Sequence, residues 1–162
     1  MTHDHILVIV EIPQGSRNKY EYDPELGAFR LDRMLFSSVH YPADYGYVKG
    51  TKAEDGDPLD AMVILEEPTF PGCAIHARPL AVLKMHDEKG SDIKILCVPA
   101  TDPRSAQVHD LEDIPPYLIR EIENFFSIYK QLEEKDVSVE GWGGADEAWA
   151  IIELAMKAAK AS

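Results

Sequence analysis

The sequence has few cysteines, no long apolar segment and no secretion signal. Two of the 162 residues are cysteine, Cys73 and Cys97, and both lie in apolar surroundings. Their separation excludes a CxxC motif and favours two small buried side chains in a reducing compartment. The longest apolar runs are far shorter than the roughly 20 residues of a membrane-spanning helix. Residues 1–5 lack a basic start and an apolar core, so we expect a cytoplasmic protein with no membrane association.

Positive charge is also scarce. Sixteen lysines and arginines face 29 aspartates and glutamates, which gives a formal net charge of −13. This balance argues against nucleic-acid binding, because a phosphate backbone requires a basic surface. It argues against an anionic ligand as well, unless many carboxylates hold divalent cations that then set the local charge.

Turn-forming residues divide the first two-thirds of the chain into short segments typical of strands. We expect residues 1–162 to form a single domain, since the length suits one core. Glycines and prolines separate the apolar segments. Strands are expected at residues 6–12, 19–22, 28–32, 45–49, 61–65, 74–85 and 93–99. Short strands divided by turns favour a small barrel or sandwich.

The last third is expected to be helical. One helix is predicted to open at Pro115 and Pro116, because apolar residues then recur at spacings of three and four. These residues are Leu118, Ile122, Phe125, Tyr129 and Leu132. A second helix is expected over residues 145–160, with Trp149, Ile152 and Met156 on one face. We expect both helices to pack against the sheet.

The most informative segment is the acidic turn, residues 55–60, with the sequence Asp-Gly-Asp-Pro-Leu-Asp. Three carboxylates with no basic residue between them repel one another in a folded cleft unless cations neutralise them. Magnesium prefers oxygen ligands of this kind. The segment alone leaves two interpretations open, a divalent-metal site and a solvated acidic turn. The calcium-binding EF-hand pattern is absent.

Other charged residues are spaced as a metal and phosphate site requires. Asp87 and Asp92 flank an expected hairpin turn, and Asp92 shares one strand face with Lys94 because the two lie two residues apart. Lys19 and Glu21 share a face in the same way. Each pair alone is better explained as a surface ion pair. Phosphate binding needs cations and hydroxyl donors. The candidates are Lys19, Arg33, Lys94, Lys130, Tyr41, Tyr45 and Tyr129.

Several motifs occur in a fixed order around the acidic turn. They are Glu11-Ile12-Pro13, Arg17-Asn18-Lys19-Tyr20-Glu21, Leu31-Asp32-Arg33, Tyr41-Pro42 with Asp44-Tyr45-Gly46, Asp92 with Lys94, Tyr129-Lys130 and Glu140-Gly141-Trp142. This set resembles the family I soluble inorganic pyrophosphatases of bacteria and archaea. The resemblance covers nearly the whole chain, from residue 11 to residue 142.

The resemblance implies an α+β, mainly β fold: a small five-stranded OB-like closed barrel with two packed α-helices, assembled as a homohexamer. It implies hydrolysis of pyrophosphate to two phosphates by metal-activated water, through direct in-line attack without a covalent intermediate. The implied cofactor is Mg²⁺, several ions per site, with Mn²⁺ or Zn²⁺ as alternative ions.

The resemblance also implies a role for each site residue. Asp57 would be the general base, and Tyr41 would support a site carboxylate. The implied metal ligands are Asp55, Asp60, Asp87, Asp92, Glu11 and Glu21. The implied substrate-binding residues are Lys19, Arg33, Tyr45, Lys94, Tyr129 and Lys130.

Two alternatives belong to a different class of function. A non-catalytic OB-fold binding module would need a basic, aromatic groove, whereas this chain supplies carboxylates. An acidic divalent-metal-binding module would bind cations and release no phosphate. Among other phosphohydrolases, the Glu-rich Nudix helix and the Asp-His-His signature of the manganese pyrophosphatases are absent.

Overall fold

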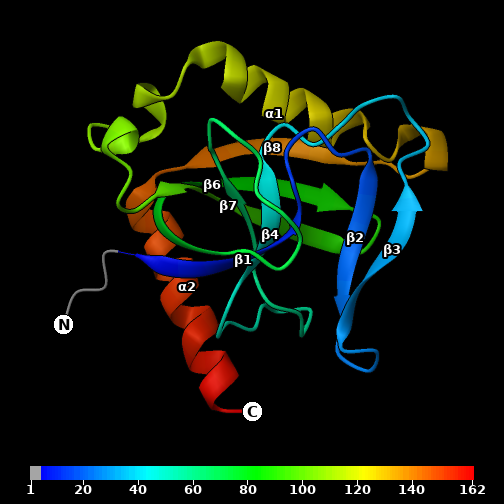
Figure 1. The fold of residues 1–162 in the computed structure, drawn as a ribbon, viewed down its shortest axis with the longest axis horizontal. Helices are drawn as coiled ribbons and strands as arrows, with labels where there is room; N and C mark the ends of the chain where they lie inside the picture. The colour runs from blue at the N-terminus through cyan, green and yellow to red at the C-terminus, as the bar shows by residue number, and fades with distance from the viewer. Residues whose placement is uncertain (1–4) are drawn as a thin grey trace.

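The computed structural model describes residues 5–162 (Figure 1). Residues 1–4, on which most of the expectation about a secretion signal depends, lie outside this part. The strands are β1 (Ile6–Ile12), β2 (Asn18–Asp23), β3 (Ala28–Met34), β4 (Asp44–Val48), β5 (Asp60–Val63), β6 (Ala74–Asp87), β7 (Gly90–Pro99) and β8 (Ser138–Gly143). The helices are α1 (Pro116–Ile128) and α2 (Ala145–Lys160), with short 3₁₀ helices η1 (Pro103–Ser105), η2 (Leu111–Asp113) and η3 (Gln131–Glu133).

Five strands pair in a closed ring. Around the ring, β1 pairs with β4, β4 with β5, β5 with β7, β7 with β6, and β6 again with β1. The β5–β7 pairing is parallel and the other four are antiparallel. The β2–β3 hairpin is a separate two-stranded sheet, which stands beside the ring in Figure 1. The predicted five-stranded closed sheet is confirmed, and so are the two α-helices within residues 5–162.

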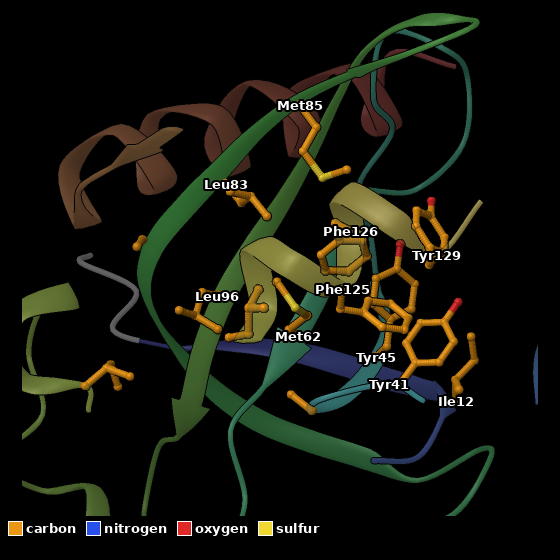
Figure 2. Close-up of a cluster of buried hydrophobic side chains, with 14 of the residues drawn as sticks. Ile12, Tyr41, Tyr45, Met62, Leu83, Met85, Leu96, Phe125, Phe126 and Tyr129 are labelled. Atoms are coloured by element: carbon orange, nitrogen blue, oxygen red, sulfur yellow. The ribbon is translucent and has the colours of Figure 1, made fainter. Parts of the chain in front are cut away.

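Side chains on both faces of the central strands are buried, and they alternate between two clusters. In β5 and β7, Met62 and Leu96 join an aromatic-rich cluster that includes Phe126 of α1 (Figure 2). Their neighbour Ile95 instead joins a second cluster, to which α2 contributes Ile152. The period-two alternation of the strands therefore assigns one helix to each cluster.

The expected strands are all present, with ends that differ by at most three residues. The expectation of a purely helical last third is wrong, because residues 138–143 form β8 and pair with β6. This strand contains Gly141 and Gly143, which have low strand propensity and conceal it in the sequence.

The ends of the helices differ in part from the expectation. Helix α1 ends at Ile128, so Leu132 does not continue its apolar stripe and is 65% exposed. On α2, the predicted face of Trp149, Ile152 and Met156 does pack against the sheet. Cys97 is buried as expected, whereas Cys73 is only partly buried. No helix within residues 5–162 is both long and apolar enough to cross a membrane.

Gly46 of β4 lies directly opposite Val10 of β1. A Cβ atom at this position would collide with the carbonyl oxygen of Ile9 and lie 2.9 Å from Cα of Val10, both in the backbone of the neighbouring strand. Glycine permits this approach because it has no side chain. The tight pairing also fixes the position of Tyr45, the preceding residue.

We predict that Gly46→Ala destabilises the protein by about 3 kcal/mol or more, because rotating a side chain cannot relieve a clash with backbone. Gly144→Ala is a matched control, since its Cβ would meet no atom within 4 Å. Thermal unfolding of the two variants tests the prediction. Equal melting temperatures would contradict the close approach of the strands.

Candidate active site

The acidic turn is held at both ends by buried groups. The hydroxyl of Thr51 donates to the carbonyl of Val48 at 2.6 Å and accepts from the N–H of Leu59 at 3.0 Å. Between these anchors, Gly56 has a φ of +92°, a left-handed conformation that favours glycine. Asp55 accepts from the N–H of Asp57 at 3.0 Å. The turn therefore holds Asp55 and Asp57 exposed on a constrained backbone, whereas Asp60 is partly buried.

Lys94 lies at the centre of the site. The parallel pairing of β5 with β7 sets Asp60 opposite Lys94. The Nζ atom of Lys94 lies 3.0 Å from carboxylate oxygens of both Asp60 and Asp92, and it donates to the hydroxyl of Tyr45 at 2.7 Å. Burial opposes the charged form, but Asp60, Tyr45 and Asp92 outweigh it and raise the pKa of Lys94 well above its usual value.

The hairpin β2–β3 supplies a second group of charges. Lys19 and Arg33 face each other across the two strands, and the pairing register shifts directly after Lys19. Asp32 joins the two cations, with one oxygen 3.5 Å from Lys19 Nζ and also bonded to Arg33 Nη1. Lys19 also lies 3.4 Å from Glu21. Burial of Asp32 is outweighed by Lys19 and Arg33, which lower its pKa.

Glu11 lies at an irregular point of β1. The register against β4 shifts between Val10 and Ile12, and bulges of this kind redirect side chains beside active sites. Burial raises the pKa of Glu11 to about 7, with Asp60 and Glu21 adding to the shift and a bond from the N–H of Tyr22 opposing it. The site thus concentrates more negative charge than its own cations neutralise.

Lys130 follows the end of α1 and contacts the hairpin between β6 and β7. Its Nζ lies 3.5 Å from Asp87 and 3.9 Å from Glu88. Partial burial of Asp87 is outweighed by the N–H of Lys89 and by Lys130, so its pKa is lowered. Asp87 is therefore held as a carboxylate at this edge of the site.

The three candidate tyrosines gather with Phe125 and Phe126 (Figure 2). Burial raises the pKa of Tyr45, and it raises that of Tyr129 to about 12. Their hydroxyls therefore stay protonated and can donate to an anion. Tyr41 is buried, with its ring centroid 4.7 Å from that of Phe125 and 5.4 Å from that of Tyr45.

One depression of about 400 Å³ brings the predicted site residues together. All of them line it except Tyr41. The ring of Tyr41 packs against that of Tyr45. They are Glu11, Lys19, Glu21, Arg33, Tyr45, Asp55, Asp57, Asp60, Asp87, Asp92, Lys94, Tyr129 and Lys130. Residues separated by more than a hundred positions in the sequence thus form one surface of mixed charge.

A second depression, of about 370 Å³, shares Asp55, Asp60 and Asp92 with the first. Its remaining walls are largely apolar, and α2 contributes Ile151 and Leu154 among them. Among residues 5–162, Lys52 is the one basic residue that lines it. The donors that a phosphate requires are therefore in the first depression.

The residues of the first depression fit a hard divalent cation. Among residues 5–162, no three histidine, cysteine or carboxylate side chains form a complete metal cage. Magnesium does not need one, because it keeps several waters and binds through one or two carboxylates and substrate phosphates. The raised pKa values of Glu11 and Asp92, both caused first by burial, mark carboxylates whose charge a cation would stabilise.

Some residues of the depression have no role in the sequence interpretation. Asp32 belongs to a recognised motif, but its link between Lys19 and Arg33 becomes visible only when β2 and β3 pair. Glu88 and Lys135 lie at the edge near Lys130. Their isolated charges carry no distinguishing pattern in the sequence.

Comparisons with known proteins agree with this geometry. A family model described as inorganic pyrophosphatase matches residues 8–160. The inorganic pyrophosphatase of Methanosarcina mazei is 57% identical over 148 residues, covering 91% of this chain and 88% of that protein. The one from Nostoc sp. is 52% identical over 155 residues, covering 96% and 92%.

A solved structure extends the agreement to the fold. The crystal structure of inorganic pyrophosphatase from Thermus thermophilus matches with a TM-score of 0.94 at 41% identity, covering 97% of this chain and 92% of that one. The predicted OB-like architecture is therefore confirmed together with the closed ring of strands. The chain belongs to the inorganic pyrophosphatase family, in the family I prokaryotic type that its motifs predict.

Proposed function

We propose that the 400 Å³ depression hydrolyses pyrophosphate by direct in-line attack of water, with Asp57 as general base. Family membership makes the chain a hydrolase that splits pyrophosphate into two phosphates. The observation that supports this site is the meeting of carboxylates, among them those of the acidic turn, with the buried ammonium group of Lys94 and the partly buried cations near it. We also propose that the protein acts in the cytoplasm.

The carboxylates and the cations take different parts in this proposal. Asp55, Asp60, Asp87 and Asp92 would hold Mg²⁺. Glu21 would assist them, and Glu11 would lie at the edge of the metal cluster. When bound, Mg²⁺ lowers the pKa of water and neutralises charge on the phosphates. The phosphates are held by Lys19, Arg33, Tyr45, Lys94, Tyr129 and Lys130. Ammonium, guanidinium and protonated hydroxyl groups all donate to phosphate oxygens and stabilise the charge that develops on the leaving phosphate.

Asp57 suits the role of base because it is exposed at the tip of the acidic turn and lines the depression. Pro58 follows it and restricts the backbone. No covalent intermediate is needed in this scheme, because the carboxylate of Asp57 orients the water and accepts its proton.

The two non-catalytic alternatives agree less well with the lining of the depression. A nucleic-acid-binding OB module would line its groove with bases and aromatic side chains, and here carboxylates alternate with the cations. A module that only binds metal would not require Arg33, Lys94 and Lys130 around one cavity. Release of phosphate from pyrophosphate distinguishes catalysis from both alternatives.

We predict that chelation abolishes this activity, that Mg²⁺ restores it, and that Ca²⁺ binds but supports little turnover. Bonds to Ca²⁺ are longer, about 2.3–2.6 Å against about 2.0–2.1 Å for Mg²⁺, and its coordination is looser, so the water would be misplaced. A phosphate-release assay with each ion after chelation is the measurement. Full activity with Ca²⁺ alone would count against the proposed mechanism.

A second prediction separates the base from the ligands. Asp57→Asn should lower the rate by roughly 10²- to 10⁴-fold with little change in the magnesium dependence, because the amide can orient water but cannot readily accept its proton. Higher pH should recover part of the rate, since hydroxide needs no base. Asp60→Asn should instead weaken the apparent affinity for magnesium, and excess magnesium should restore much of the rate.

The measurement is a magnesium titration of the rate for each of these two variants, at two pH values. Asp57 would have to be reassigned as a ligand if magnesium, and not pH, rescued Asp57→Asn. If Asp60→Asn leaves the magnesium titration unchanged, Asp60 is not a metal ligand.

We further propose that the chain assembles as a homohexamer. Exposed apolar side chains along and after β3, at Leu31, Met34 and Phe36, are suited to contacts between copies. We predict a mass near six times the 18.1 kDa of one chain, with closed symmetry. Light scattering at several protein concentrations tests this, and a stable active monomer would refute it.

A further inference from the structure

Arg33 and Glu133 form an ion pair between two separate parts of the fold. Arg33 belongs to the hairpin strand β3, and Glu133 ends the short helix η3, three residues after Lys130. Arg33 Nη2 lies 3.0 Å from Glu133 Oε1. The Glu133 side chain is only 6% exposed, although no earlier step of the proposed reaction uses it. The pair joins the β2–β3 hairpin to the segment that carries Tyr129 and Lys130.

The pairing of these two side chains is incomplete. Within the described residues, the buried side-chain atoms that lack a hydrogen-bond partner are Arg33 Nε and Glu133 Oε2. These two atoms belong to the same ion pair. Guanidinium and carboxylate groups commonly form two parallel bonds, and the Nε and Nη2 atoms of arginine make one edge of that fork. The two unpartnered atoms are therefore the ones that the second bond of such a fork would join.

The remaining edge of the guanidinium faces an acidic group of the depression. Arg33 Nη1 bonds to Asp32 Oδ2, and the same oxygen lies 3.5 Å from Lys19 Nζ. Asp32 thus lies between two of the cations assigned to phosphate. A phosphate oxygen carries the same sign of charge and could replace the carboxylate oxygen on Nη1.

We propose that Glu133 is a positioning residue for Arg33: its carboxylate holds the guanidinium at Nη2, so that Nη1 is directed towards a phosphate of the substrate. This inference depends on the proposed role of Arg33 in substrate binding. Burial opposes the charge of Arg33, and the bonds to Glu133 and Asp32 outweigh this effect and raise its pKa, so the fork remains charged.

The first test is Glu133→Gln, which keeps the size of the side chain and removes its charge. We expect kcat/KM for pyrophosphate to fall about tenfold, mainly through KM, because the guanidinium of Arg33 then contacts a neutral amide in place of a carboxylate. The magnesium concentration for half-maximal rate should stay unchanged, since no proposed metal ligand is altered. Glu121→Gln is the matched control, because Glu121 is exposed on α1, and it should leave all three quantities unchanged.

A double-mutant cycle with Arg33→Lys separates positioning from a structural role. Lysine cannot form the fork, so Arg33→Lys should itself lower kcat/KM despite keeping the charge. In the Arg33→Lys background, Glu133→Gln should change kcat/KM by less than about twofold. Fully additive losses would overturn the inference, because Glu133 would then act independently of Arg33.

The outcomes distinguish this inference from the proposed site. If Arg33→Lys leaves the kinetics unchanged, Arg33 does not bind substrate, and both assignments are wrong. If Arg33→Lys impairs turnover and Glu133→Gln does not, only the role of Glu133 is wrong.

A further variant is needed if Glu133→Gln lowers the melting temperature. Glu133→Asp keeps the charge, so it should recover part of the loss in KM. No recovery would overturn the inference.

Discussion

The Lys94 side chain is only 3% exposed, and its ammonium group depends on the compensating groups around it. Desolvating a charge costs several kcal/mol unless hydrogen-bonded partners of opposite charge surround it. Lys94 finds them in Asp60, Asp92 and the Tyr45 hydroxyl, and its ammonium also lies 5.4 Å from the centre of the Phe126 ring. Strands β4, β5 and β7 and helix α1 must all be in place for this arrangement. The closed ring and the charged site are therefore mutually dependent.

The same principle extends to the other cations of the depression. Lys19 is near Asp32 and Glu21, Arg33 binds Asp32 and Glu133, and Lys130 contacts Asp87. Under the proposed function these pairs are exchangeable, except that Arg33 keeps its contact with Glu133. Phosphate oxygens would replace the other carboxylates on the cations, and the released metal ligands Glu21 and Asp87 would then be able to hold divalent cations. Because both exchanges replace one charged partner with another, the groups need not be desolvated anew.

The sequence predicts the parts of this structure that are encoded locally. The acidic turn can be recognised because its carboxylates lie within six residues, and β1 because its apolar run ends at Pro13. The end of η3 is not predictable, since Glu134, with a φ of +59°, adopts the left-handed conformation there without being glycine. Glu133 escapes prediction for another reason, because its partner Arg33 belongs to a hairpin far away in the sequence.

The acidity of the whole chain bears on the form in which the substrate arrives. A formal charge of −13 generates a field that repels a free pyrophosphate anion at long range, and salt screens it beyond about 10 Å. A pyrophosphate that already carries divalent cations has less negative charge, so it meets less repulsion. Within the depression, Lys19, Arg33, Lys94 and Lys130 then act over contact distances, where the field of the distant carboxylates matters little. The overall charge thus favours the approach of the metal complex of pyrophosphate, and the local cations contact its phosphates once it has arrived.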